Sequence, residues 1–241
     1  FPGYEADSAS RRDFSSAIDA MVGRPIGSGF SEETPPSMIE PIARIRIELQ
    51  EIEPKIWRRV DVPLSATLFA LHDIIQVAMG WKDAHLFEFV VGDKVYGEPD
   101  PDDALYERKV YQAKSIRLQA LVDRGIGRFV YAYDFGDDWR HDVIIEELSD
   151  GAADIDYPAF VDGARRGPPE DVGGACGFMD FLEAVLDPGH QEHQRMLTWY
   201  GGPFDPDDID ERHIRVVLSM LADRRKGPIA SHRSGRRGRK A

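Results

Sequence analysis

Alternating apolar and polar residues define the first predicted elements. From Ala43 to Leu49 every second residue is apolar, with charged or polar residues between them. This period of two places one face of a strand on a core and the other in water. The same alternation runs over residues 56–62, and residues 51–54 suit a turn, so we expect a β-hairpin.

A helical period follows the hairpin. Apolar residues in 68–78 recur at intervals of three and four, Thr67 suits an N-cap, and Gly80 suits the C-terminal end. A second hairpin is expected over 86–91 and 94–96, a short helix over 115–122, and two strands over 129–133 and 139–148. A stretch rich in Gly, Pro and acidic residues then reaches residue 177, and helices are predicted over 178–186, 190–199 and 208–225.

This order predicts the fold class and the domain limits. Strands come early and helices late without regular alternation, which is typical of an α+β fold. We expect an antiparallel or mixed sheet of two to three hairpins with a crossing helix, followed by a C-terminal helical segment. Residues 1–40 are predicted to be a poorly ordered leader, 41–225 a single domain, and 226–241 a basic disordered tail.

Composition narrows the class of protein. The 241 residues are 42% hydrophobic, which is enough for a globular core. The one cysteine, Cys176, forms no intramolecular disulfide, and the N-terminal residues lack a signal-peptide pattern, so we expect a cytoplasmic protein. His72 and Asp73 interrupt the most apolar helical stretch, which predicts no membrane partner.

Charge is divided unevenly along the chain. Of the 30 Lys and Arg residues, eight follow Asp223, so residues 1–223 hold 22 basic against 43 acidic residues, a net charge of −21. Such a body repels the phosphates of nucleic acid. Nucleic acid contact is therefore expected through the tail alone, at Arg233, Arg236, Arg237, Arg239 and Lys240.

Seven sequence blocks occur in the order found in a known family. They are PKIWRRV at 54–60, LHDIIQ with MGW at 71–81, HLFEF at 85–89, YDFGDDW with His141, PPEDVGG at 168–174, DP at 187–188 with His190 and His193, and GG with FDP at 201–206. In these blocks the chain resembles the plasmid pRiA4b ORF-3-like family, whose members are often labelled resolvase-like passenger proteins of mobile elements. The resemblance implies an association with plasmids or mobile elements. It does not carry over recombinase activity, because the nucleophilic serine among arginines and the helix-turn-helix of serine recombinases are not visible here.

Carboxylates and histidines form the candidate polar pocket. We expect the loop at 168–174 to pack against the turn at 134–141, and neutral imidazoles and carboxylates are ligands for Zn, Mn or Fe. The predicted metal ligands are His141, His190 and His193, the last two separated by three positions on a predicted helix. The favoured interpretation is nevertheless a network of caps and salt bridges without a metal or other cofactor, and the bound metal is the alternative. The whole candidate set comprises Asp134, Asp137, Asp138, His141, Glu170, Asp171, His190 and His193.

Four tryptophans fall in separate blocks, and most are expected to anchor the core. Trp57, Arg58 and Arg59 form a candidate interaction surface, since interfaces are enriched in Trp and Arg. The favoured function is thus a non-catalytic binding module with a protein partner. The alternatives are a metal-dependent hydrolase that uses the His and carboxylate cluster, and nucleic acid contact through the tail.

Overall fold

Eight strands form one mixed sheet in this computed structural model, which describes residues 40–100, 103 and 108–226. The strand order is β5-β4-β3-β6-β7-β1-β2-β8, and all neighbours are antiparallel except β4 and β5. The α+β prediction is confirmed, although the sheet is larger than two to three hairpins. The strands are β1 (Pro41–Leu49), β2 (Trp57–Pro63), β3 (Phe87–Val91), β4 (Lys94–Gly97), β5 (Val110–Gln112), β6 (Arg128–Tyr133), β7 (Trp139–Asp150) and β8 (Ala159–Ala164).

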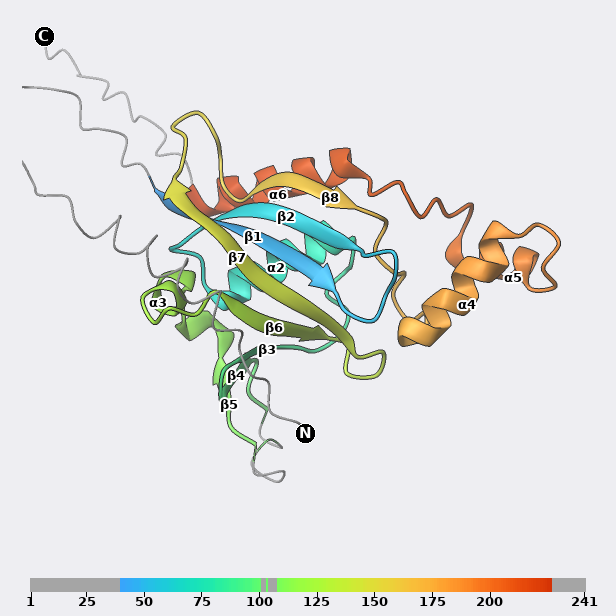
Figure 1. Cartoon of the computed structure of the whole chain (residues 1–241), viewed down its shortest axis with the longest axis horizontal. Coiled ribbons are helices and arrows are strands. Elements are labelled where there is room, and N and C mark those ends of the chain that lie inside the picture. The colour runs from blue at the N-terminus through green and yellow to red at the C-terminus, as the bar shows by residue number, and fades with distance from the viewer. Residues whose placement is uncertain (1–39, 101–102, 104–107, 227–241) are drawn as a thin grey trace, which may run out of the picture.

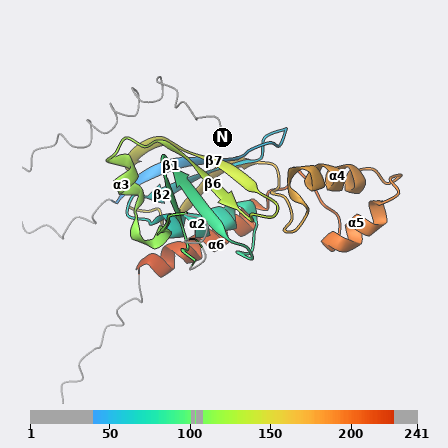
Figure 2. The ribbon, with the colours of Figure 1, turned by 90° about the horizontal axis from the view of Figure 1, so that it is seen from below.

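Helices cover one face of this sheet. Helix α2 (Leu68–Met79) and helix α6 (Glu211–Lys226) lie together on the same side of the strands (Figures 1 and 2). The buried residues Ile45 and Ile47 of β1 face this layer, whereas Arg44 and Arg46 lie on the open face. The two-residue period of the sequence thus matches a two-layer structure with one solvated sheet face.

The predicted caps hold α2 in place. The Thr67 side chain accepts a hydrogen bond from the Ala70 backbone N–H at 3.1 Å, and Gly80 adopts a left-handed conformation with φ 83°. These are the two ends expected for a helix with a hydroxyl N-cap and a glycine C-terminal cap. After β5 the chain forms a 3₁₀ turn at Ala113–Ser115 and then helix α3 (Leu118–Val122). Between these two, Arg117 forms an isolated β-bridge with Thr67, the N-cap residue of α2.

Two edge strands were not predicted. Strand β5 has three residues, and β8 contains Gly163 in a segment where Gly, Pro and acidic residues mask any alternation. Both lie at the edges of the sheet, where backbone pairing with one neighbour suffices. Edge strands are commonly short, so pairing, more than sequence pattern, defines them here.

A second group of helices lies beside the sheet. Helix α4 (Gly174–Leu186) and helix α5 (His193–Tyr200) pack around Phe181, whose ring contacts Trp199, Tyr200 and Phe204 at centroid distances of 5.7, 5.8 and 5.1 Å (Figure 1). The predicted helix over 190–199 begins only at His193, so His190 precedes it in a turn. No helix within the described ranges has the length and apolar character needed to span a membrane.

Candidate functional site

The paired ends of β3 and β6 create the centre of the site. Phe87 on β3 lies opposite Tyr133 on β6, and the Asp134 N–H donates to the Leu86 carbonyl at 3.0 Å. His85, just before β3, and Asp134, just after β6, are therefore brought side by side. Their Nε2 and Oδ2 atoms are 3.5 Å apart.

Two more carboxylates arrive from the loop before α4. The His85 Nε2 lies 3.1 Å from Asp171 Oδ1 and 3.8 Å from Glu170 Oε2. We call His85, Asp134, Glu170 and Asp171 the His85 centre. His85, Asp134 and Asp171 also form the one group of potential metal ligands found among the described residues, with all three ligand atoms within 4.8 Å of one another.

Backbone and side-chain donors orient the carboxylates. The Asp134 Oδ1 accepts hydrogen bonds from the N–H groups of Gly136 and Asp137, at 3.0 and 3.3 Å, which leaves Oδ2 facing His85. The Glu170 Oε1 accepts from the Lys82 N–H at 2.8 Å and from the Tyr133 hydroxyl at 3.1 Å. The ligand atoms are thus preorganised by their neighbours.

Tyr133 remains a hydrogen-bond donor over a wide pH range. Burial raises the pKa of the Tyr133 hydroxyl well above its usual value, and the negative charge of the nearby Glu170 carboxylate raises it further. Its hydroxyl also accepts a hydrogen bond from the Ala84 N–H at 3.0 Å. The phenol therefore ties the loop between α2 and β3 to the Glu170 carboxylate.

Backbone conformation is unusual around the His85 centre. Asp134 and Asp171 have φ values of 54° and 58°, in the left-handed region that aspartate tolerates better than most residues. Sparsely populated conformations of this kind concentrate at functional sites, where neighbouring structure holds them. Here the strained residues are themselves the carboxylate ligand candidates.

The His85 centre has little compensating positive charge. In the described chain no Lys or Arg side-chain nitrogen lies within 4.0 Å of the Asp134, Glu170 or Asp171 carboxylates, and His85 is the one ion-pair partner of each. The His85 Nε2 is closed off from solvent and has no hydrogen-bond partner among those residues. Three carboxylates therefore surround the His85 Nε2, although this nitrogen makes no hydrogen bond to any of them.

A cleft of about 760 Å³ adjoins the centre. Its walls come from the end of α2, the segment 166–171, the end of α5 and the beginning of α6, and both Glu170 and Asp171 line it. The Trp81 indole N–H donates to the Pro168 carbonyl at 2.8 Å, which holds this segment against α2. Gly167 permits the close approach, because a Cβ there would lie 2.2 Å from the Met79 carbonyl oxygen.

The predicted contact between the 168–174 loop and the 134–141 turn is present. The Gly173 N–H donates to Asp137 Oδ2 at 3.1 Å, so Asp137 joins the two segments without facing His85. Asp138 instead pairs with Arg140 at 3.0 Å. Of the predicted pocket residues, the structure assembles Asp134, Glu170 and Asp171 at one point.

The three predicted metal-binding histidines do not converge, and that prediction is wrong. His141 points into the core from β7, where its ring packs on Trp81 and Tyr131 at 5.2 and 5.5 Å. His190 accepts from the Glu192 N–H at 3.1 Å, and His193 donates to the Ala184 carbonyl at 2.9 Å. The inward face of β7 and the turn before α5 keep these histidines apart.

His85 is the site residue that sequence reasoning missed. It belongs to the HLFEF block, but the block was interpreted as a strand of a hairpin with residues 94–96. Pairing of that strand with residues 128–133 brings the residues that precede one strand beside the residue that follows the other. Sequence periodicity identifies strands but does not identify their non-local partners.

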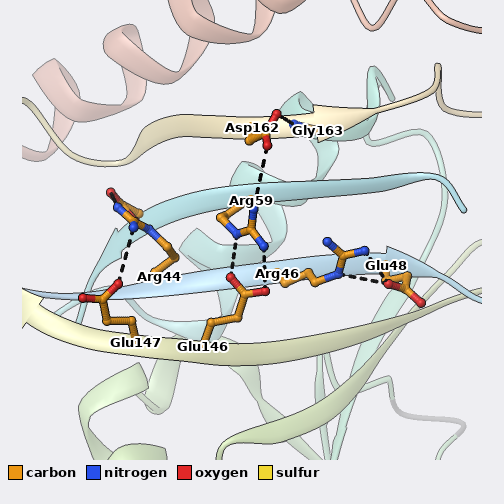
Figure 3. A network of polar contacts seen from close by, with 9 residues as sticks. Arg44, Arg46, Glu48, Arg59, Glu146, Glu147, Asp162 and Gly163 are labelled. Atoms are coloured by element: carbon orange, nitrogen blue, oxygen red, sulfur yellow. Dashed lines mark hydrogen bonds and ion pairs between the residues drawn. The ribbon is translucent and has the colours of Figure 1, made fainter. Parts of the chain in front are cut away.

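The predicted interaction surface is also corrected. Arg58 is 1% exposed because it shares the inward face of β2 with Val60 and Val62. Trp57 and Arg59 do lie on the open face, where Arg59 pairs with Glu146 at 2.6 Å and with Asp162 at 3.8 Å (Figure 3). This hydrogen bond from Arg59 lowers the pKa of Glu146.

Comparison with known proteins assigns the chain to a family. The family model described as plasmid pRiA4b ORF-3-like protein matches residues 41–213. The chain belongs to the plasmid pRiA4b ORF-3-like family. All four residues of the His85 centre lie within the part that matches this ORF-3-like family.

Two proteins similar to this chain are described without a function. The chain is 38% identical over 167 residues to the uncharacterized protein y4hQ of Sinorhizobium fredii (strain NBRC 101917 / NGR234), covering 68% of this chain and 83% of that protein. It is also similar to the crystal structure of MM3350, a protein of unknown function from Methanosarcina mazei Go1. That match has a TM-score of 0.66 and 30% identity, and covers 73% of this chain and 98% of the other.

Proposed function

We propose that the protein is a binding module that holds a divalent first-row metal ion at the His85 centre. The supporting observation is the convergence of one imidazole nitrogen and three carboxylates within 3.1–3.8 Å. A metal–ligand distance of about 2.1 Å separates adjacent ligand atoms by roughly 3.0–3.4 Å in octahedral or tetrahedral geometry. His85, Asp134 and Asp171 suit direct ligation, and Glu170 suits a fourth or outer position.

Charge balance favours a metal over a protonated histidine. An imidazolium contributes one positive charge and one N–H toward three carboxylates, which leaves a net charge of −2. A divalent ion with a neutral imidazole leaves −1 and contacts several oxygens at once. Imidazole and carboxylate together are typical ligands of Zn²⁺ and Mn²⁺.

Calorimetric titration of chelator-treated protein with Zn²⁺ or Mn²⁺ tests this function. We expect one ion per chain, with affinity lowered at least about 100-fold in His85→Ala and about tenfold in Asp171→Asn. His190→Ala is the matched control, because the ring of this histidine accepts from the Glu192 N–H in the turn before α5 and is not among the His85 centre, so its affinity should equal that of the unchanged protein. Equal affinity in His85→Ala and the unchanged protein would contradict the proposal.

Metal-dependent hydrolysis is the second candidate. Glu170 and Asp171 line both the His85 centre and the cleft, so a bound ion would lie at the cleft rim, where it could activate water against a bound ester. An aryl phosphate or aryl ester assay with Zn²⁺ or Mn²⁺ tests this use. Turnover above the metal-only blank that is lost in His85→Ala supports catalysis, and metal binding without turnover supports the non-catalytic module.

Protein and nucleic acid partners remain separate predictions. On the open face of the sheet, the Trp57 ring is already flanked by Arg46 and Arg59, at 4.1 and 5.1 Å from its centroid, and the arginines have carboxylate partners. This face therefore offers few unpaired charges to a protein. The basic tail lies outside the described residues, and comparing RNA and DNA binding of the full chain and a chain ending at residue 226 would test its role.

A further inference from the structure

Arg58 is a buried cation at the inner wall of the cleft. Its side chain leaves β2 toward the helix layer, where its Nε donates to the Ala78 carbonyl at 2.7 Å. Its Nη1 donates to the carbonyls of Trp57 and Ala164 at 2.8 and 3.1 Å. These bonds place the guanidinium at the negative end of α2, where a cation is stabilised.

The contacts at the end of α2 satisfy only part of the Arg58 guanidinium: Nε and Nη1 have acceptors, but the positive charge has no carboxylate partner among the described residues. Throughout the described ranges no carboxylate pairs with Arg58, and its Nη2 donates to no protein acceptor. Burial lowers the pKa of Arg58 to about 10, with a smaller contribution from Arg166, so the group is still a cation at neutral pH. A helix end supplies only about half an opposing charge, and a buried charge without a counter-ion is costly.

The cleft around Arg58 combines positive charge with an aromatic wall. Arg58, Lys82 and Arg166 all line it, and Arg166 is held by the Tyr200 hydroxyl at 3.0 Å. Trp199 lines the same cleft with 48% of its surface exposed, so apolar ring surface is available to a bound group. Three carboxylates line the cleft as well: Glu170 and Asp171, which belong to the His85 centre, and Asp210, which accepts from the His213 N–H at 3.4 Å at the beginning of α6. Outside the lining, Asp208 pairs with Arg166 at 3.3 Å.

We propose that this cleft binds an organic oxyanion, a carboxylate or phosphate carried on a flat apolar group. The oxyanion accepts hydrogen bonds from Nη2 of Arg58 and supplies the missing counter-charge. The apolar group lies against Trp199. This inference rests on different residues from the proposed metal function and does not require a bound ion.

Titration of the full-length protein with phenyl phosphate and with benzoate, in the presence of EDTA, tests the proposal. EDTA removes any metal contribution, so this result is independent of the metal experiment. We expect saturable 1:1 binding of at least one oxyanion by calorimetry, and no binding of benzyl alcohol, which lacks the charge. Phenyl phosphate and benzoate distinguish a phosphate site from a carboxylate site.

Three variants locate the site. We expect Arg58→Gln to weaken binding at least about tenfold, because a charge-assisted hydrogen bond is lost, and Trp199→Ala to weaken it about fivefold. Arg59→Gln is the matched control, since the adjacent arginine pairs with Glu146 on the opposite sheet face, and its affinity should not change. Wild-type affinity in folded Arg58→Gln would overturn the proposal.

Wild-type protein supplies a measurement that does not depend on the folding of Arg58→Gln. In the NMR spectrum, the Arg58 side-chain N–H resonances should shift on addition of the bound oxyanion, whereas those of Arg59 should stay in place. Failure of both oxyanions to bind, or binding without a shift of the Arg58 resonances, would overturn the proposal.

Discussion

The Nδ1 of His72 on α2 lies 2.8 Å from the hydroxyl of Tyr131 on β6. The Nε2 of His72 donates to Asp83 Oδ1 at 2.9 Å, because a carboxylate only accepts; Nδ1 therefore accepts the Tyr131 proton. The Tyr131 oxygen in turn accepts from Gln76 Nε2 at 2.9 Å. This buried network connects α2, the sheet and the loop that leads to His85.

Removing the Tyr131 hydroxyl should therefore destabilise the protein. In Tyr131→Phe, His72 Nδ1 and Gln76 Nε2 lose a buried partner, and we expect the free energy of unfolding to fall by about 1–3 kcal/mol in chemical denaturation. Tyr96→Phe is the control, because Tyr96 is 6% exposed and its hydroxyl has no hydrogen bond in the described chain. Equal stability of the two variants would show that the network contributes nothing.

Two buried histidines should contribute a loss of stability below about pH 6.5. Burial lowers the pKa of His72 and lowers that of His141 to about 3, so the unfolded chain binds these protons more readily than the folded one. The histidine contribution is therefore complete above the unfolded pKa and is lost as the pH falls through it. For His141 the loss between pH 6.5 and 5 is about 2 kcal/mol.

The variant His141→Leu isolates this effect. It lacks the titrating group, so its free energy of unfolding should fall by about 2 kcal/mol less than that of the unchanged protein between pH 6.5 and 5. Denaturant unfolding at the two pH values measures the difference. If the free energy of unfolding fell equally in the two proteins between pH 6.5 and 5, His141 would not be the source of the pH dependence.

Trp139 should be a major core anchor. It is 2% exposed on β7 and its ring lies 6.2 Å from that of Trp81. We expect Trp139→Ala to cost about 3–5 kcal/mol of unfolding free energy. Trp199→Ala, at a residue that is 48% exposed, should cost about 1 kcal/mol or less, and a similar loss in both variants would refute the distinction.

Gly174 should affect metal binding at the His85 centre by positioning the loop that carries Glu170 and Asp171. A Cβ at this position would lie 2.7 Å from the Asp137 carbonyl oxygen, so alanine would displace the loop that carries Glu170 and Asp171. We expect Gly174→Ala to lower Zn²⁺ or Mn²⁺ affinity about tenfold in calorimetric titration, as for a lost supporting contact.

A second glycine separates backbone strain from steric contact. Gly125 has φ 68°, close to the 67° of Gly174, but a Cβ there would meet nothing within 4 Å. Gly125→Ala should therefore leave metal affinity unchanged while it carries the same conformational strain. Metal affinity equal to the unchanged protein in both variants would show that loop docking does not organise the centre.

Local patterns determined much of the fold. Alternation in the first hairpin and helical spacing after Thr67 predicted β1, β2 and α2, because these periods depend only on which residues face the core. The same local reasoning placed Asp134, Glu170 and Asp171 in the candidate pocket and expected their two loops to meet. It failed for β5 and β8, which are edge strands defined by their pairing with a neighbour.

Tertiary structure alone decided which polar residues share a site. Alternation in β7 placed His141 in the core, where burial favours the neutral ring, and not beside the carboxylates. Pairing of β3 with β6 brought His85 to Asp134, although 49 positions separate them, and a one-residue change of register would have turned these ends to different faces. Strand pairing is a long-range choice made by packing of the whole sheet, so no local sequence pattern encoded the centre.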